Sequence, residues 1–298
     1  MYSSNSTLSR FKASLRLIAA ALVLVTSMLA VTGVGAACSK KTKAIAVLMD
    51  IAPEQTSRFS YWAIADLNED EDLWDIYDRF KDSSDARQLG EFVQVLAVVK
   101  DSGRILGSDN AATLQAPVTV LRADFDTNYV EGQLETLGYS RSEHRDVGIW
   151  VAGDGQPYRP VALLSGTILI GNATELEACI DAVKNKADSL YDNPHIQVLA
   201  KRLPQGILVE ACRATASSDE TYTDLVAYGK SYNKAKSDLL KVTAVYVFRD
   251  GPAAGTALQP IRERLSATFR DVRIDRDENL VIATAKISII GFAQSLQF

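Results

Sequence analysis

Short apolar segments with strand-like composition recur along the chain, and each ends at an acidic residue that precedes an amphipathic helical pattern. A carboxylate at that position can accept hydrogen bonds from the free N–H groups of a first helical turn. The three strand–helix pairs are Phe59–Asp66 with 70–80, Val118–Asp124 with 127–137, and Val242–Asp250 with 252–270. The hydrophobic pattern therefore predicts a chain that combines strands and helices throughout its length.

The middle third has the clearest order of elements. Asp126 and Asn172 stand where helix N-caps are expected, and Gly153–Pro157 is a turn signal between two apolar runs. Strands are predicted at 118–124, 145–152, 158–170 and 206–213, and helices at 127–137 and 173–187. A further short helix is predicted to begin at Asn193-Pro194. The order β-α-β-β-α-β predicts a ferredoxin-like unit over about residues 118–214.

The outer thirds extend this pattern. The N-terminal third is predicted to add a strand, a helix and a hairpin that turns at Asp101–Gly103. The C-terminal third is predicted to contain a helix over 220–239, a strand, a helix that Pro260 kinks or splits, and a hairpin that turns at Asp277–Asn279. Together these elements predict an α+β fold, with antiparallel sheet and helices packed mainly on one face.

The N-terminal segment has the charge order of a secretory signal. The first 37 residues contain no acidic residue, and Arg10, Lys12 and Arg16 precede the apolar run Leu17–Ala37. Small residues then stand directly before Cys38. This arrangement resembles the bacterial lipoprotein signal, in which the cysteine is lipidated and becomes the mature N-terminus. The resemblance implies that Cys38 carries the lipid, although Gly35 stands where that family usually has Leu.

Two alternatives remain for this segment. Cleavage after Ala36 or Ala37 would release an exported protein without an anchor. The 21-residue apolar run is also long enough to span a bilayer and could be retained as an uncleaved anchor. All three interpretations place the folded part outside the cytoplasm. The predicted organisation is a signal peptide over 1–37, a lipid-anchored stem over 38–57 and an α+β ectodomain over 58–298.

Composition and charge narrow the classes of protein. The chain is 47% hydrophobic and 23% charged, which is typical of a folded domain and not of a disordered one. The formal net charge is −5, and residues 38–298 contain 29 basic and 37 acidic residues. We expect no nucleic-acid partner, because such proteins carry a basic surface. Membrane contact is expected only through the N-terminal anchor.

Cys179 and Cys212 form an even pair once Cys38 is lipidated. Cys179 falls in the predicted helix 173–187 and Cys212 in the predicted strand 206–213. A disulfide between them is one interpretation, because an exported protein folds in an oxidising compartment. Two buried free thiols are the other.

Known catalytic and cofactor motifs have little support. Asp66 to Tyr77 has the acidic spacing of an EF-hand loop at its start, but Glu71 stands in place of the turn glycine and Tyr77 in place of the last ligand. The sequence contains two histidines, His144 and His195, but no Gly-x-Ser-x-Gly motif that would supply a nucleophile for either of them. It also contains no phosphate-binding glycine loop. The aromatic residues are expected in the core rather than in a binding cleft. We therefore expect no cofactor, no metal and no enzymatic activity.

Several segments resemble a broad family of exported bacterial proteins, lipoproteins among them, that have no assigned activity. They are Tyr61–Asp66, Leu73–Phe80, Ala162–Asp181, Ser189–His195 and Arg202–Gly206. The likeness covers about the middle two-thirds of the chain and rests on residues that shape strands, turns and helix starts. It implies an exported α+β protein and carries over no functional residue.

The sequence thus predicts a non-enzymatic envelope lipoprotein that binds a partner protein or a ligand outside the cytoplasm. One alternative is an exported hydrolase that uses two carboxylates on envelope material. Another is an accessory subunit that docks on a membrane complex through an exposed apolar face.

Overall fold

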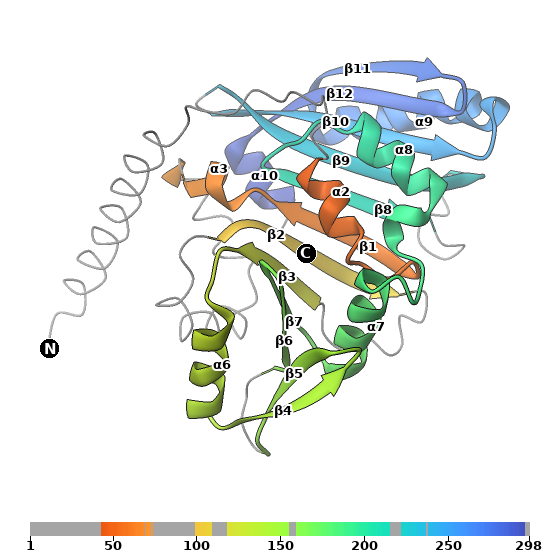
Figure 1. Ribbon diagram of the computed structural model, residues 1–298. Helices are drawn as coiled ribbons and strands as arrows, with labels where there is room; N and C mark the ends of the chain where they lie inside the picture. Colours follow the sequence, from red (N-terminus) through yellow and green to blue (C-terminus); the bar gives the residue numbers. More distant parts are fainter. Residues whose placement is uncertain are drawn as a thin grey trace, which may run out of the picture. The chain divides into compact units, whose positions relative to one another are not determined.

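The computed structural model describes residues 43–68, 70, 71, 73, 99–108, 118–154, 159–214, 222–236 and 238–295. Within these ranges twelve strands form one sheet, and every neighbouring pair is antiparallel (Figure 1). The strands are β1 Thr56–Trp62, β2 Val99–Ser108, β3 Val118–Ala123, β4 Tyr139–His144, β5 Val147–Ala152, β6 Val161–Leu164, β7 Thr167–Ile170, β8 Leu208–Arg213, β9 Leu225–Lys236, β10 Leu239–Phe248, β11 Arg270–Asp277 and β12 Leu280–Ser288. Their order across the sheet is β11-β12-β10-β9-β8-β1-β2-β3-β7-β6-β5-β4. The predicted α+β class and antiparallel sheet are confirmed.

Helices cover both faces of this sheet. On what we call the first face lie α2 (Ala44–Met49), α7 (Ala173–Val183) and α8 (Pro194–Arg202), whose Ile45, Cys179 and Leu199 are buried with Phe59 of β1. On the second face, α6 (Thr127–Thr136) packs Val130 near Leu121 of β3. Also on the second face, α9 (Gly251–Thr268) and α10 (Ile289–Ser295) cover β10 and β12. The prediction that helices pack mainly on one face is wrong.

The strand register shows that α6 and α9 share the second face. Cross-strand partners lie on the same side of a sheet, so a row of partners can be followed from one strand to the next. One such row joins Val242, Tyr232, Leu208, Trp62, Ser102 and Leu121. Val242, at one end of this row, lies in the core under α9 and α10. Leu121, at the other end, lies in the core under α6.

The middle third does not form the predicted ferredoxin-like unit. The expected strand 158–170 is two strands, β6 and β7, because the chain turns between them at Gly166, whose φ is 65°. This reversal makes β7 antiparallel to β3, whereas the split βαβ arrangement needs a parallel pair. In addition, β1 and β2 lie between β3 and β8. The result is an antiparallel meander, β4-β5-β6-β7, attached to β3.

Three local predictions are also corrected. The predicted helix 220–239 is instead the long strand β9, in which buried and half-buried residues alternate from Leu225 onward. The predicted turn at Asp101–Gly103 lies inside the continuous strand β2. The predicted stem 38–57 is too long, because Ile45, Leu48 and Met49 of α2 are already buried in the core. Residues 44–57 therefore belong to the folded part, which the prediction began at residue 58.

Several helix starts and one hairpin are confirmed. Asp126, Asn172, Asn193 and Asp250 are the N-caps of α6, α7, α8 and α9, and each accepts backbone N–H hydrogen bonds through its side chain. The predicted split at Pro260 is wrong, because the helix α9 runs through this proline without interruption as far as Thr268. The last hairpin, β11–β12, turns at Glu278-Asn279. None of the helices in the described ranges combines the length and the hydropathy that a membrane-spanning helix requires.

Candidate functional site

Lys43, at the N-terminal end of the described residues, forms hydrogen bonds to the C-terminal end of α8. Its Nζ donates hydrogen bonds to the backbone oxygens of Ala200, Lys201 and Leu203, at 3.0, 3.1 and 2.7 Å. The last carbonyls of a helix have no partner within the helix and carry partial negative charge, so an ammonium group is well suited to them. Lys43 lies five positions after Cys38 in the sequence.

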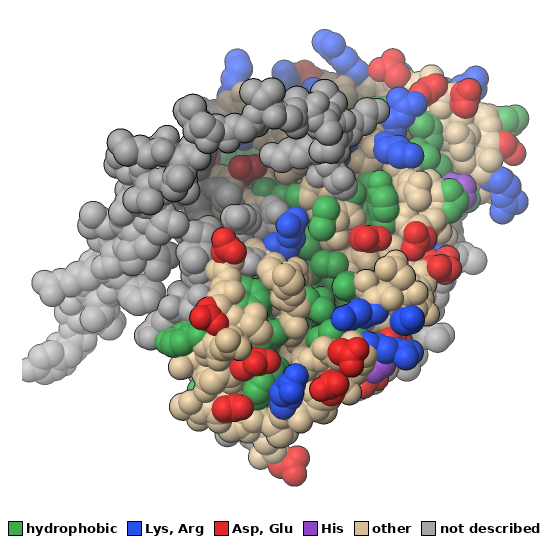
Figure 2. All heavy atoms as spheres, viewed as in Figure 1, with side chains coloured by type: hydrophobic (Ala, Val, Ile, Leu, Met, Phe, Trp, Pro, Cys, Tyr) green, Lys and Arg blue, Asp and Glu red, His purple; other side chains and the backbone are tan. Residues whose placement is uncertain are grey.

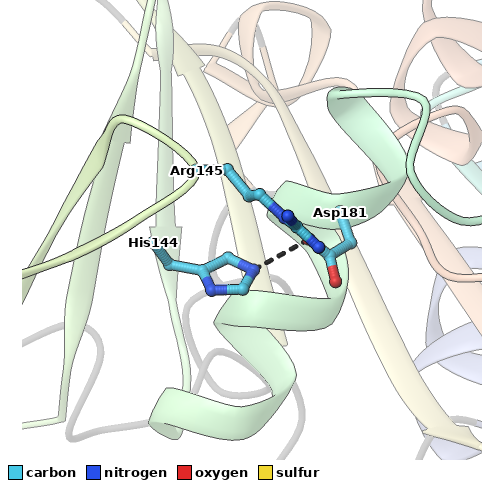
Figure 3. Close-up of polar contacts among 3 residues, drawn as sticks. All are labelled: His144, Arg145 and Asp181. Atoms are coloured by element: carbon cyan, nitrogen blue, oxygen red, sulfur yellow. Dashed lines mark hydrogen bonds and ion pairs between the residues drawn. The ribbon is translucent and has the colours of Figure 1, made fainter.

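His144, Arg145 and Asp181 form a polar cluster between the β4–β5 hairpin and α7 (Figure 3). His144 Nε2 lies 2.8 Å from Asp181 Oδ1, and Arg145 Nε donates to the same oxygen at 3.1 Å. Arg145 and Asp146 have φ values of 51° and 62°, so the hairpin closes through a two-residue turn of the type that suits paired strands. This turn directs both side chains toward α7, as Figure 3 shows.

Electrostatics and neighbours indicate that this cluster has a structural role. The hydrogen bonds from His144 and Arg145 lower the pKa of Asp181. The nearby hydroxyl of Ser142 donates to the carbonyl of Ile149, so it is engaged away from the imidazole. The cluster holds the edge hairpin against α7. His195 is half-buried within the first turn of α8, where its backbone N–H donates to Asn193 Oδ1.

A second set of polar side chains lies in the middle of the second face, on three adjacent strands. We call this set the central strip: Arg58, Ser60, Glu210, Cys212, Tyr228 and Lys230. The register aligns Ser60, Glu210 and Lys230 in one row across β1, β8 and β9. The next row is Arg58, Cys212 and Tyr228. A carboxylate thus lies between two cations on an otherwise largely apolar sheet.

The central strip is partly removed from water. Burial raises the pKa of Glu210, while the positive charges of Lys230 and Arg58 act in the opposite direction. Burial also raises the pKa of the Cys212 thiol, which shares a hydrogen bond with the Tyr228 hydroxyl. The Tyr228 ring in turn stacks on Tyr246 of β10, with the ring centroids 6.4 Å apart. Arg58 is exposed, so the strip has charged groups that a binding partner could reach.

Sequence reasoning missed the central strip. The charge at Glu210 interrupts the apolar run of β8, and this was the available signal. A single buried charge in a strand predicts a partner on a neighbouring strand. Finding that partner requires the pairing of β1, β8 and β9, which the sequence order does not reveal.

Both predicted disulfide partners are free, buried thiols. Cys179 is buried in the core of the first face, together with Ala211. Cys212 is the next residue along β8 after Ala211, so its side chain points to the second face. The sheet therefore separates the two sulfurs, and the second of the two sequence interpretations describes the structure. Burial raises the pKa of Cys179 to about 12.

The remaining sequence candidates are placed as follows. Trp62 and Trp150 are buried in the core, as expected. Half of the EF-hand-like segment 66–77, including Trp74 and Tyr77, lies outside the described residues, as do Cys38 and Tyr158. Across the described ranges, no three His, Cys, Asp or Glu side chains come together as metal ligands could.

Comparison with known proteins bears on the fold. A crystal structure of TP0453 (crystal form IV) is similar to this chain with a TM-score of 0.50 and 10% sequence identity, over 84% of this chain and 96% of that one. No protein-family model and no curated protein matches the chain. At this identity the likeness supports the α+β architecture alone.

Proposed function

We propose that this protein is a lipid-anchored, extracytoplasmic binding protein without enzymatic activity. The lipid would be carried by Cys38, and the folded part from Lys43 onward would bind a partner protein or a ligand. The three arginine and lysine side chains before Leu17, the apolar run and the small residues before Cys38 support export and lipidation.

The observation that carries the proposal is the attachment of Lys43 to α8. Lys43, whose ammonium group donates these three hydrogen bonds, lies only five positions after Cys38. An extended chain covers at most about 3.6 Å per residue, so an anchor at Cys38 would hold this end of the folded part within about 18 Å of the membrane. Such a short connection is suited to a protein that works at the membrane surface.

The central strip is the surface that we assign to binding. Glu210 lies between Lys230 and Arg58, which gives the strip both a hydrogen-bond acceptor and two cationic donors. Partly desolvated charges of this kind strengthen and orient polar contacts more than fully hydrated ones do. We therefore expect a ligand or partner segment that offers both a negative and a positive group.

The anchor is tested by the intact mass of the protein from the membrane fraction of a bacterial host. We expect the mass of residues 38–298 plus a diacylglyceryl group, and loss of that species in the variant C38S. A full-length mass would instead indicate an uncleaved apolar anchor. An unmodified mature mass in the soluble fraction would indicate simple secretion.

Binding is tested with a photo-crosslinking residue in place of Arg58, in the full chain expressed in its envelope. Glu177, which is exposed on α7, provides the matched control position. We expect a discrete crosslinked species from position 58 that the additional substitution K230E removes. Equal crosslinking from both positions, or none from position 58, would contradict the assignment of the central strip.

A further inference from the structure

A row of basic side chains begins beside the attachment point of Lys43. Leu203, which accepts the shortest hydrogen bond from Lys43, is followed by Pro204, whose carbonyl accepts a hydrogen bond from Ser231 of β9. Two residues further along β9, Asn233 pairs with Lys241 of β10, which pairs with Lys286 of β12. Lys286 in turn pairs with Arg270 of β11. Neighbouring strands are about 4.8 Å apart, so this row spans roughly 14 Å from Asn233.

We call the edge of the sheet where β9 ends and β10 begins the basic rim, and we define it by six exposed residues that project from both faces of the sheet. They are Lys201 at the end of α8, Lys234 and Lys236 of β9, Lys241, Lys286 and Arg270. Figure 2 shows Lys and Arg side chains over this part of the molecule, around α8 and β10 to β12, with some Asp and Glu side chains among them.

Only part of this positive charge is balanced locally. Lys234 pairs with Asp70, and Lys286 pairs with Asp271 at 2.8 Å. In the ranges that the structure describes, Lys201, Lys236 and Lys241 form no ion pair. Among the described residues, the six basic side chains of the rim outnumber the acidic side chains Asp70, Asp271 and Asp238 beside them, although residues 38–298 as a whole have more acidic than basic residues.

An exposed apolar side chain lies at the same edge. Ile290 of α10 is 73% exposed. The preceding residue, Ile289, donates its N–H to the carbonyl of Asp238 at the tip of the β9–β10 hairpin. An exposed large apolar residue at the same edge as several lysines is typical of surfaces that rest on lipid headgroups, where the apolar group enters the interface and the amines remain at the phosphates.

We propose that the basic rim contacts the anionic headgroups of the membrane in which the protein is anchored. This inference rests on the proposed anchor at Cys38, because the five positions to Lys43 keep the rim close to the lipid surface. The separation of charge also orients the protein, since the net acidic remainder is repelled by the same headgroups.

The test uses the full chain in vesicles, with a fluorophore on the variant A235C. Ala235 is exposed between Lys234 and Lys236, and the native thiols Cys179 and Cys212 are buried. The control position is E135C, exposed on α6 at the far part of the sheet. The vesicles contain phosphatidylcholine alone or phosphatidylcholine with phosphatidylglycerol, and a quencher attached to the lipid headgroup reports proximity.

We expect quenching at A235C with phosphatidylglycerol, little with phosphatidylcholine alone, and little at E135C in either. The pair K236E and K241E should abolish the quenching, and so should high salt, because headgroup attraction is screened. The matched control is the pair K184E and K186E, exposed lysines beside the opposite, C-terminal end of α2, which should leave it unchanged. Quenching that does not depend on phosphatidylglycerol, or that survives the rim substitutions, overturns the inference.

Failure of the anchor and failure of the rim remain distinguishable. The intact mass reports the anchor independently of the fluorophore. If the mass shows no anchor, the labelled variants with the further substitution C38S, which prevents labelling at Cys38, are added to preformed vesicles. Quenching that depends on phosphatidylglycerol would then retain the rim while ending the anchored function. A lipidated protein without quenching would retain the anchor and end the rim.

Discussion

Lys43 Nζ lies 2.7 Å from the backbone oxygen of Leu203, a residue 160 positions further along the chain. Together with the carbonyls of Ala200 and Lys201, this oxygen belongs to the end of α8, where helix carbonyls lack partners within the helix. The side chain of Lys43, at the N-terminal end of the described residues, thus caps the C-terminal end of α8, a helix in the second half of the chain. The contact joins α2, which follows Lys43, to α8 on the first face of the sheet.

Substitution K43M should destabilise the folded part by about 1–3 kcal/mol, because it removes a charged donor from three carbonyls and keeps the aliphatic stem. Urea unfolding followed by circular dichroism measures the change. The control K201M alters an exposed lysine at the same end of α8, and it should change the free energy of unfolding by less than about 0.5 kcal/mol. Equal stability of K43M and the natural chain would mean that water replaces the ammonium group without loss.

The elements that sequence reasoning predicted well are those with local causes. Asp126, Asn172, Asn193 and Asp250 cap helices because each side chain reaches N–H groups two or three residues ahead, a distance that the sequence shows directly. The strand β9 was missed because its burial pattern is imposed by neighbouring strands and not by the local sequence. Leu225, Gly229 and Tyr232 have helical spacing, but burial alternates with a two-residue period from Leu225 to Ser231, because β9 pairs with both β8 and β10.

The sites depend on pairing between segments that are distant in the sequence, so local sequence patterns could not predict them. Arg58, Glu210 and Lys230 come together only because β8 pairs with both β1 and β9. The sequence places Lys43 in the predicted lysine-rich stem, and only the structure shows that its ammonium group binds three carbonyls at the end of α8. The two cysteines fall in the predicted helix and strand, but the alternation of side chains along β8 decides that Cys212 faces away from Cys179.

Gly229 of β9 should tolerate no side chain. A Cβ there would lie 2.7 Å from the carbonyl oxygen of Glu210 and 2.7 Å from Leu203 Cδ1. We expect G229A to destabilise the protein by about 1–3 kcal/mol through overpacking. The matched control is G132A in α6, where a Cβ meets nothing within 4 Å. That variant should gain about 0.5–1 kcal/mol, because Ala favours the helix. Thermal unfolding of both variants checks the contrast, and a neutral G229A would contradict the close approach.

Cys179 and Cys212 should react with iodoacetamide only after unfolding. Both thiols are buried, and burial raises the pKa of Cys179 to about 12, so the reactive thiolate is scarce in the folded protein. Mass spectrometry of the folded and the urea-unfolded protein measures the labelling, with the unfolded sample as the control for reagent activity. A mass change on reduction of the folded protein would reveal a disulfide and refute the free thiols.

Asp181 should contribute to stability at neutral pH and lose that contribution in acid. Hydrogen bonds from His144 and Arg145 lower its pKa in the folded state, so the ionised form stabilises the fold above the ordinary Asp pKa. The contribution disappears as the pH falls through the lowered value. We expect D181N to lose less than about 1 kcal/mol at neutral pH, because the pair is partly exposed, and to approach the natural chain in acid. The exposed control E177Q should follow the natural chain at every pH, and a constant deficit of D181N would rule out titration as the cause.

Glu210 should have the opposite effect of pH. Its folded-state pKa is raised because burial disfavours the carboxylate, even beside Lys230 and Arg58. Below the ordinary Glu pKa of about 4.3 the group is neutral in both states, and its contribution to stability is fully present. As the pH rises through the folded-state value, the unfolded chain has already released the proton and this contribution is lost. The variant E210Q stays neutral, so its free energy of unfolding should gain on that of the natural chain as the pH rises through this window. Urea unfolding at a series of pH values measures the gain, with the exposed E135Q as the control. A deficit of E210Q that grows with pH would instead mean that the attraction of Lys230 and Arg58 exceeds the cost of burying the carboxylate.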